Sequence, residues 1–325
     1  MAETTFATGN SATVKRWATK LWIEMPKEIV FGKWMRENDD NGIIEVKREL
    51  DGQPGDTIYY SLLTKLDGAG VEDDTDLEGS EEEQQYNTDS MALIQRRNAV
   101  KLGGRLSQRR TMFDQRMGAK KQLKTWLAEN IDAYMFTQFD SSPTSTIYGG
   151  AATSTATLTA ADRFTPALID KAVAKARKAT PQIWPVRVQG ADWYVVLIHT
   201  DNSYDLKRDA EWREAQKDAK PRADDNPIFT AMLGTYGGGV IHEHVNVPVS
   251  TTYGASANLA GASCYVFGRQ AGLFAWGSRP QAWEKEFQYG AQVGFAIGAI
   301  WAMKKAIFDS VDNAMISIKV SRSNN

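Results

Sequence analysis

Apolar side chains recur at three- and four-residue intervals between residues 113 and 136, which is the period of a helix that buries one face. The spacing predicts a helix over residues 113–136, and at 1.5 Å per residue this helix is about 36 Å long. A second helix is predicted over residues 166–178, because Pro166 stands at its first position. A charged segment with a sparse apolar side predicts a third helix over residues 203–219.

Runs of β-branched and aromatic residues predict strands elsewhere along the chain. The predicted strands cover residues 56–64, 193–199, 240–247, 262–268, 271–276 and 314–320. Residues 293–303 are nearly all apolar but are too few for a bilayer-spanning helix, so they indicate a buried strand or a core helix. Helices and strands are mixed without a regular βαβ alternation, so the predicted fold class is α+β.

Composition narrows the class of protein. The chain has 325 residues, 42% hydrophobic and 24% charged, which is ordinary for a folded protein of one or two domains. The single cysteine, Cys264, excludes an intrachain disulfide and a thiolate metal cluster, and its apolar surroundings predict a buried thiol. The first ten residues lack a secretory signal, so we expect a protein made in the cytoplasm.

The net charge of -2 hides a strongly polarised middle. Residues 67–89 contain ten acids and no Lys or Arg, whereas residues 96–124 contain ten bases and one acid. Such a run of acids is expected to be an exposed loop or a hairpin tip. It is either a solvated loop or a surface that meets the basic segment of another subunit.

Candidate catalytic groups are weak. The chain has no GxxxxGK[ST] phosphate loop and no GxSxG nucleophile motif. His242 and His244 would share one face of a strand and could hold a metal with a third ligand, although a polar edge-strand face is the favoured interpretation. His199 ends an apolar strand and is expected to be a hydrogen-bonded structural histidine. The sequence predicts no enzyme, no catalytic or metal-binding residue and no cofactor.

Several segments, in this order and spacing, carry a resemblance to a known family. They are Leu77-Glu-Gly-Ser-Glu-Glu82, Arg96-Arg-Asn-Ala-Val100, Ser107-Gln-Arg-Arg-Thr111, Phe113-Asp114, Leu123-Lys-Thr-Trp-Leu-Ala128, Tyr194-Val-Val-Leu-Ile-His199, Asn226-Pro-Ile-Phe-Thr230, Gly272-Leu-Phe-Ala-Trp-Gly277 and Tyr289-Gly-Ala-Gln-Val-Gly-Phe-Ala296. With the order of elements, they resemble the major capsid proteins of tailed phages with the Hong Kong 97-type fold. Within that fold they resemble the branch related to N4-like phage coat proteins.

The resemblance implies a division of the chain. It implies an N-terminal arm over residues 1–50, an extended hairpin arm over 51–104 and an axial domain over 185–280. A peripheral domain would comprise residues 105–184 and 281–325, with a spine helix over 113–136.

The resemblance also implies partners. Copies of the chain would form the hexamers and pentamers of an icosahedral shell around double-stranded DNA, in the virion and without a membrane. A portal protein at one vertex, a scaffolding or decoration protein, and non-specific contacts with the packaged DNA complete the expected partners. The alternative is a soluble nucleic-acid- or ligand-binding protein that uses residues 96–124, although residues 96–112 contain no aromatic side chain for base stacking.

The expected intersubunit contacts fall into three groups. Aromatic residues of the N-terminal arm, including Phe31, should pack on another subunit, because large exposed apolar areas are rare in soluble monomers. The acidic segment should meet the basic segment of a neighbour. The residues chosen are Trp17, Trp22 and Trp34 in the arm, Glu72, Asp73, Asp74, Glu81, Glu82 and Glu83 in the acidic segment, and Arg96, Arg97, Arg105, Arg109, Arg110 and Arg116 in the basic segment.

Overall fold

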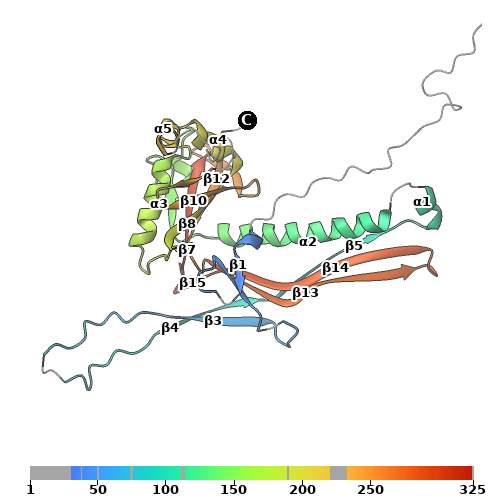
Figure 1. Cartoon of the computed structure of the whole chain (residues 1–325), viewed down its shortest axis with the longest axis horizontal. Coiled ribbons are helices and arrows are strands. Elements are labelled where there is room, and N and C mark those ends of the chain that lie inside the picture. Colours follow the sequence, from blue (N-terminus) through green and yellow to red (C-terminus); the bar gives the residue numbers. More distant parts are fainter. Residues whose placement is uncertain are drawn as a thin grey trace, which may run out of the picture.

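The computed structural model describes residues 31–37, 39–49, 51–73, 76–110, 114–188, 190–219 and 233–323. An elongated body consists of one long helix lying along a sheet, and a compact body stands over one end of that helix (Figure 1). A hairpin extends from the elongated body on the side of the sheet away from the helix (Figure 1).

The elongated body is built on a five-stranded sheet in the order β1-β2-β13-β14-β5. The two longest strands form an antiparallel pair, and β2 joins it in parallel. Its elements are η1 (Phe31–Lys33), β1 (Met35–Glu37), β2 (Ile44–Lys47), β5 (Ile94–Lys101), α1 (Arg105–Arg110), α2 (Gln115–Asp140), β13 (Gly272–Phe287) and β14 (Gln292–Lys305).

The compact body is built on an eight-stranded sheet. Its path runs β6-β17-β12-β8-β10-β9, with β11 added to β12 and β7 to β8. Its elements are β6 (Thr146–Tyr148), η2 (Thr155–Thr157), α3 (Pro166–Lys178), β7 (Val186–Val188), β8 (Ala191–Ile198), α4 (Thr200–Arg208), α5 (Ala210–Ala219), β9 (Thr235–Tyr236), β10 (Gly239–Glu243), β11 (Val249–Tyr253), β12 (Leu259–Phe267) and β17 (Met315–Ser321).

Two small sheets complete the described fold. The antiparallel hairpin consists of β3 (Thr57–Leu63) and β4 (Tyr86–Ala92), and β15 (Ile307–Phe308) pairs with β16 (Val311–Asp312). The hairpin rests on the elongated body through a separate cluster that includes Ile58, Tyr60, Met91 and Leu273.

The long helix begins two residues later and ends four residues later than its periodicity predicts. Asp114 sets the start, because its side chain accepts hydrogen bonds from the backbone N–H groups of Arg116 and Met117 at 2.9 and 3.1 Å. The predicted helix over residues 203–219 is wrong as a single element. Asp209 divides it, and the Asp209 side chain accepts N–H groups from Glu211 and Trp212 at the start of α5.

The two sheets do not follow the residue ranges expected for the peripheral and axial domains. The last strand, β17, was expected with the spine helix but pairs with β12 of the compact body. The strand β13 begins at Gly272, inside the expected axial range, but lies in the sheet of the elongated body. Strands that are distant in sequence pair because their side chains pack together, and the local sequence pattern does not reveal such pairs. The order of elements alone therefore assigns β17 and β13 each to the wrong body.

One aromatic cluster joins the two bodies. Phe31 lies with its ring centroid 4.8 Å from that of Phe136, 5.4 Å from Phe139 and 6.4 Å from Phe267. All four rings are buried. Phe31 is therefore part of its own chain's core, which corrects the expectation that it covers a neighbouring subunit.

Candidate intersubunit surfaces

The acidic segment lies at the far end of the hairpin. We call residues 64–73 and 76–85 the acidic tip, because these described residues lie between β3 and β4 and extend away from both bodies (Figure 1). Glu72, Asp73 and Glu81–Glu83 are all exposed there, as the sequence predicts, while Asp74 lies outside the described residues. The carboxylate of Glu82 accepts hydrogen bonds from the N–H groups of Asp67 and Gly68 at 2.7 and 2.8 Å, so it also folds the tip on itself.

A polar clasp holds the base of the hairpin to β14. Tyr60 donates its hydroxyl to Asp89 at 2.7 Å, and the Lys304 ammonium lies 2.6 Å from the other Asp89 oxygen. Burial alone would raise the pKa of Asp89, but the hydrogen bonds from Lys304 and Tyr60 outweigh it and leave that pKa below 3.8. The pKa of Tyr60 is raised, first by burial and then by its hydrogen bond to the carboxylate.

Neutralising the clasp should loosen the hairpin. In Asp89→Asn, we expect amide hydrogen exchange in β3 and β4 to be at least tenfold faster at pH 7, because a hydrogen bond to a charged group contributes about 1.5–3 kcal/mol. Since the folded-state pKa is lowered, the stabilisation is fully present above pH 4 and is lost as the pH falls through the folded-state pKa. The wild-type hairpin should therefore lose protection only below about pH 4. The control is Lys65→Met, which removes an exposed ion pair with Asp67 in the tip, and equal exchange in both variants would contradict the clasp.

The basic segment is not one surface. Arg96 lies 5.9 Å from the ring centroid of Tyr134 on α2, whereas the alternation of β5 sends Arg97 to the opposite face of the sheet. Arg116 on α2 lies 3.6 Å from Glu284 of its own chain. Arg105, Arg109 and Arg110 lie exposed on the short helix α1. Their contacts with a neighbouring subunit remain a prediction.

The arm residues divide in a similar way. Trp17 and Trp22 lie outside the described residues. Trp34 is half-buried, with its ring centroid 5.7 Å from that of Phe31 and 5.4 Å from that of His242. Its contact with a neighbouring subunit remains a prediction.

The two candidate metal ligands differ in burial. His242 is exposed beside Trp34, whereas His244 follows the end of β10 and is buried, stacked at 5.7 Å on Phe136. Among the described residues, no group of three or more His, Cys, Asp or Glu side chains is arranged to hold a metal ion. The strand β10 ends at Glu243, before His244, and the two imidazoles contact different rings, Trp34 and Phe136, that both pack on Phe31.

His199 and Cys264 are structural, as the sequence predicts. His199 accepts the backbone N–H of Asp201 at the start of α4. Burial lowers its pKa, so the neutral imidazole that can accept this bond is favoured. The Cys264 thiol is fully buried, which raises its pKa to about 12 and disfavours the nucleophilic thiolate.

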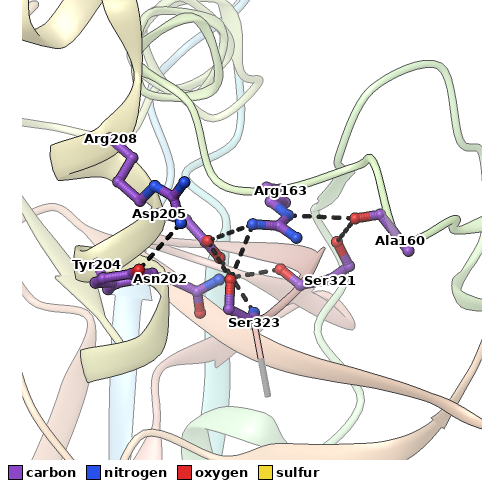
Figure 2. A network of polar contacts seen from close by, with 8 residues as sticks. All are labelled: Ala160, Arg163, Asn202, Tyr204, Asp205, Arg208, Ser321 and Ser323. Atoms are coloured by element: carbon purple, nitrogen blue, oxygen red, sulfur yellow. Dashed lines mark hydrogen bonds and ion pairs between the residues drawn. The ribbon is translucent and has the colours of Figure 1, made fainter. Parts of the chain in front are cut away.

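A polar network that the sequence does not signal fixes the chain's last described residues. Figure 2 shows Asp205 of α4 between Arg163, whose guanidinium lies 3.0 Å from its carboxylate, and the N–H and hydroxyl of Ser323. Asn202 donates to the Ser321 carbonyl at 3.1 Å. The Asp205 side chain is only 1% exposed, yet it lies in a charged segment whose pattern suggests a solvated helix. The network connects the end of strand β17 to α4, so its residues have a structural role.

A family described as phage capsid protein matches residues 5–140 and 138–320. The chain belongs to this family. It is a capsid protein of the phage head shell, located in the virion, and its role is structural and not enzymatic. A curated relative, the major capsid protein of Pseudomonas phage KPP25, is 27% identical over 91% of this chain and 89% of its own length.

Solved capsids share the fold over the full length. The capsid of Ralstonia phage GP4 has a TM-score of 0.83 and 28% identity, covering 99% of both chains. The capsid of cyanophage Pam1 has a TM-score of 0.88 at 22% identity and covers 100% of both chains. The α+β, Hong Kong 97-type capsid fold predicted from the sequence is thus confirmed. In the part of the chain that is described, no helix is long and apolar enough to cross a membrane.

Proposed function

We propose that copies of this chain assemble into hexamers and pentamers that close an icosahedral shell around the double-stranded DNA of a phage. The observation that carries the proposal is the likeness to the Ralstonia phage GP4 capsid, at 28% identity over 99% of both chains. The shape of the subunit supports it. The hairpin extends beyond the body of its own chain and presents acids and exposed apolar side chains there, such as Leu66 and Leu77.

The parts of the subunit have proposed roles in the shell. The N-terminal arm, expected over residues 1–50, is limited in this proposal to residues 1–30, because η1, β1 and β2 belong to the elongated body. Of the arm expected over residues 51–104, residues 51–92 would lie over an adjacent subunit, because β5 belongs to the same body. The compact body would meet its copies at the symmetry axes as the axial domain, and the elongated body would form the peripheral domain around the spine helix α2. The segment order described from the sequence further supports a place in the branch related to N4-like phages.

Other partners follow from a closed, filled head. A portal protein at one vertex admits the DNA, a scaffolding or decoration protein assists or covers the shell, and the inner surface contacts the DNA without sequence specificity. The alternative of a soluble nucleic-acid-binding protein has little support, since the basic segment is divided between two faces of a sheet and the long helix.

Assembly is tested on the purified full chain. Negative-stain microscopy and light scattering should reveal shells, rings or tubes, because subunits with these extended arms are expected to interlock. Protein that stays monomeric at high concentration, across low and physiological salt and with or without co-expressed phage head proteins, would contradict the proposal.

A further inference from the structure

The face of the five-stranded sheet opposite α2 carries a groove of about 470 Å³. We call it the basic groove and define it by Arg97, Lys101, Trp283, Lys285 and Phe287, which line it with neighbouring small residues. Strand register brings these side chains together. Lys285 and Lys101 both pair with Gly294, from opposite sides of β14, and Trp283 pairs with Ala296, two residues further along β14.

Strand alternation sorts the charges between the two faces of this sheet. Val293 and Phe295 of β14 pack against α2, so their cross-strand partners Glu286 and Glu284 belong to the helix-covered face. Glu284 accordingly lies 3.6 Å from Arg116 of α2. The basic groove therefore has three cationic side chains, and no Asp or Glu is among its described lining residues.

The floor of the groove requires small residues. A Cβ atom on Gly294 would lie 2.8 Å from the Phe287 ring, and one on Gly298 would lie 3.1 Å from the Trp283 ring. The rings of Phe287 and Trp283 thus lie close to the backbone of β14. The Trp283 side chain remains 47% exposed. The ammonium groups of Lys101 and Lys285 lie 4.9 and 5.3 Å from the Phe287 ring centroid. The result is an apolar floor edged by cations.

The acidic tip has the complementary chemistry. It is rich in carboxylates, and Lys65 is the one basic residue in its sequence. It also carries three exposed apolar side chains, Leu66, Val71 and Leu77. A nucleic acid would match the cations, but the tip matches both the cations and the apolar floor. The tip cannot reach the groove of its own chain, because it extends in the direction opposite to the β13–β14 turn (Figure 1).

We propose that the basic groove is the binding site for the acidic tip of a second copy of this chain. This inference rests on the proposed assembly and adds the place and chemistry of one contact. The carboxylates of Glu81 and Glu82 accept hydrogen bonds from backbone N–H groups within the tip. We therefore expect the other exposed carboxylates, those of Glu78 and Glu83, to contact Lys101 and Lys285. Of the six arginines that the sequence expectation gave to the basic partner, only Arg97 lines the groove.

A disulfide trap tests the position of the tip. The native Cys264 is buried, so engineered surface cysteines can be oxidised with little background. Full-length protein carrying Leu77→Cys and Trp283→Cys should give a ladder of covalently linked subunits on a non-reducing gel. Leu77→Cys with Met117→Cys, which is 69% exposed on α2, is the matched control and should give none. A ladder from the control pair alone, or from neither pair in assembled particles, overturns the site.

Charge reversal tests its chemistry. Lys101→Glu with Lys285→Glu should lower particle yield at least tenfold at low salt, and adding Glu78→Lys with Glu83→Lys in the same chain should restore most of it. Lys121→Glu with Lys124→Glu makes the same charge change at exposed positions of α2 and should assemble normally.

The outcomes separate the two proposals. If wild-type particles form and the groove variant assembles as well as wild type, the basic groove is not the tip's site, although the shell proposal stands. If the groove variant assembles normally but loses binding of a fluorescent 20-nucleotide single strand, the groove is a nucleic-acid surface and the inference is wrong. If wild-type protein forms no particles under any condition, the proposed function fails and this contact fails with it.

Discussion

Replacing Phe31 by alanine should lower the free energy of unfolding by about 3–5 kcal/mol, which is the range for removing a fully buried aromatic ring. Phe31 is 0% exposed and contacts rings from α2 and β12, so its loss opens a cavity at the junction of the two bodies. Urea unfolding followed by circular dichroism measures the change. Trp34→Ala is the comparison, and it should cost less because Trp34 is only half-buried.

The same burial decides where an arm truncation can be made. Deletion of residues 1–34 removes Phe31 from the core and should destabilise the subunit, so failed assembly of that protein would say nothing about the arm. Deletion of residues 1–30 keeps Phe31 and isolates the arm's contribution to assembly. If both truncated proteins unfold at the same urea concentration as the full chain, the role of Phe31 as a core residue is contradicted.

The local elements could be predicted because the signals for them lie within their own segments of the sequence. The apolar spacing of α2 and the proline at the start of α3 both correspond to observed helices. The division between α4 and α5 could not be read from that spacing, since it depends on the Asp209 side chain capping the second helix in place of continuing the first.

The pairing of segments that are distant in the sequence was harder to predict than the local elements. The sequence describes residues 96–124 as one basic block, but β5 places Arg96 and Arg97 on opposite faces, and only β13 supplies the aromatic residues that residues 96–112 lack. The alternation in Trp283-Glu-Lys-Glu-Phe287 could have indicated a strand with one basic-aromatic face and one acidic face. It was missed because the predicted strand stopped at residue 276, while β13 continues to Phe287.

Burial of a lysine was the least predictable feature. Lys304 and Lys305 follow an apolar stretch and look like its polar end, yet both belong to strand β14. The Lys305 side chain is 5% exposed and lies 2.8 Å from Asp312, whose side chain is 2% exposed. It also donates to the carbonyls of Ser141 and Ser142, which follow α2. Lys305 therefore fastens the end of the long helix to β14 and β16.

Replacing Lys305 by methionine should cost about 3–5 kcal/mol of unfolding free energy, because Asp312 is left as a buried charge without its partner. Arg187→Met is the matched control, since its ion pair with Asp192 is mostly exposed and should contribute less than about 1 kcal/mol. Urea unfolding of both variants gives the comparison.

A third variant separates the buried charge from lost packing. In Lys305→Met with Asp312→Leu, both charges are replaced by apolar groups, so most of the stability lost in the single variant should return. The backbone N–H of Thr144 loses its Asp312 acceptor in this variant, which sets the part that does not return. If the single Lys305→Met variant is no less stable than Arg187→Met, the pair does not fasten the helix. If the double variant is as unstable as the single one, shape and not charge accounts for the loss.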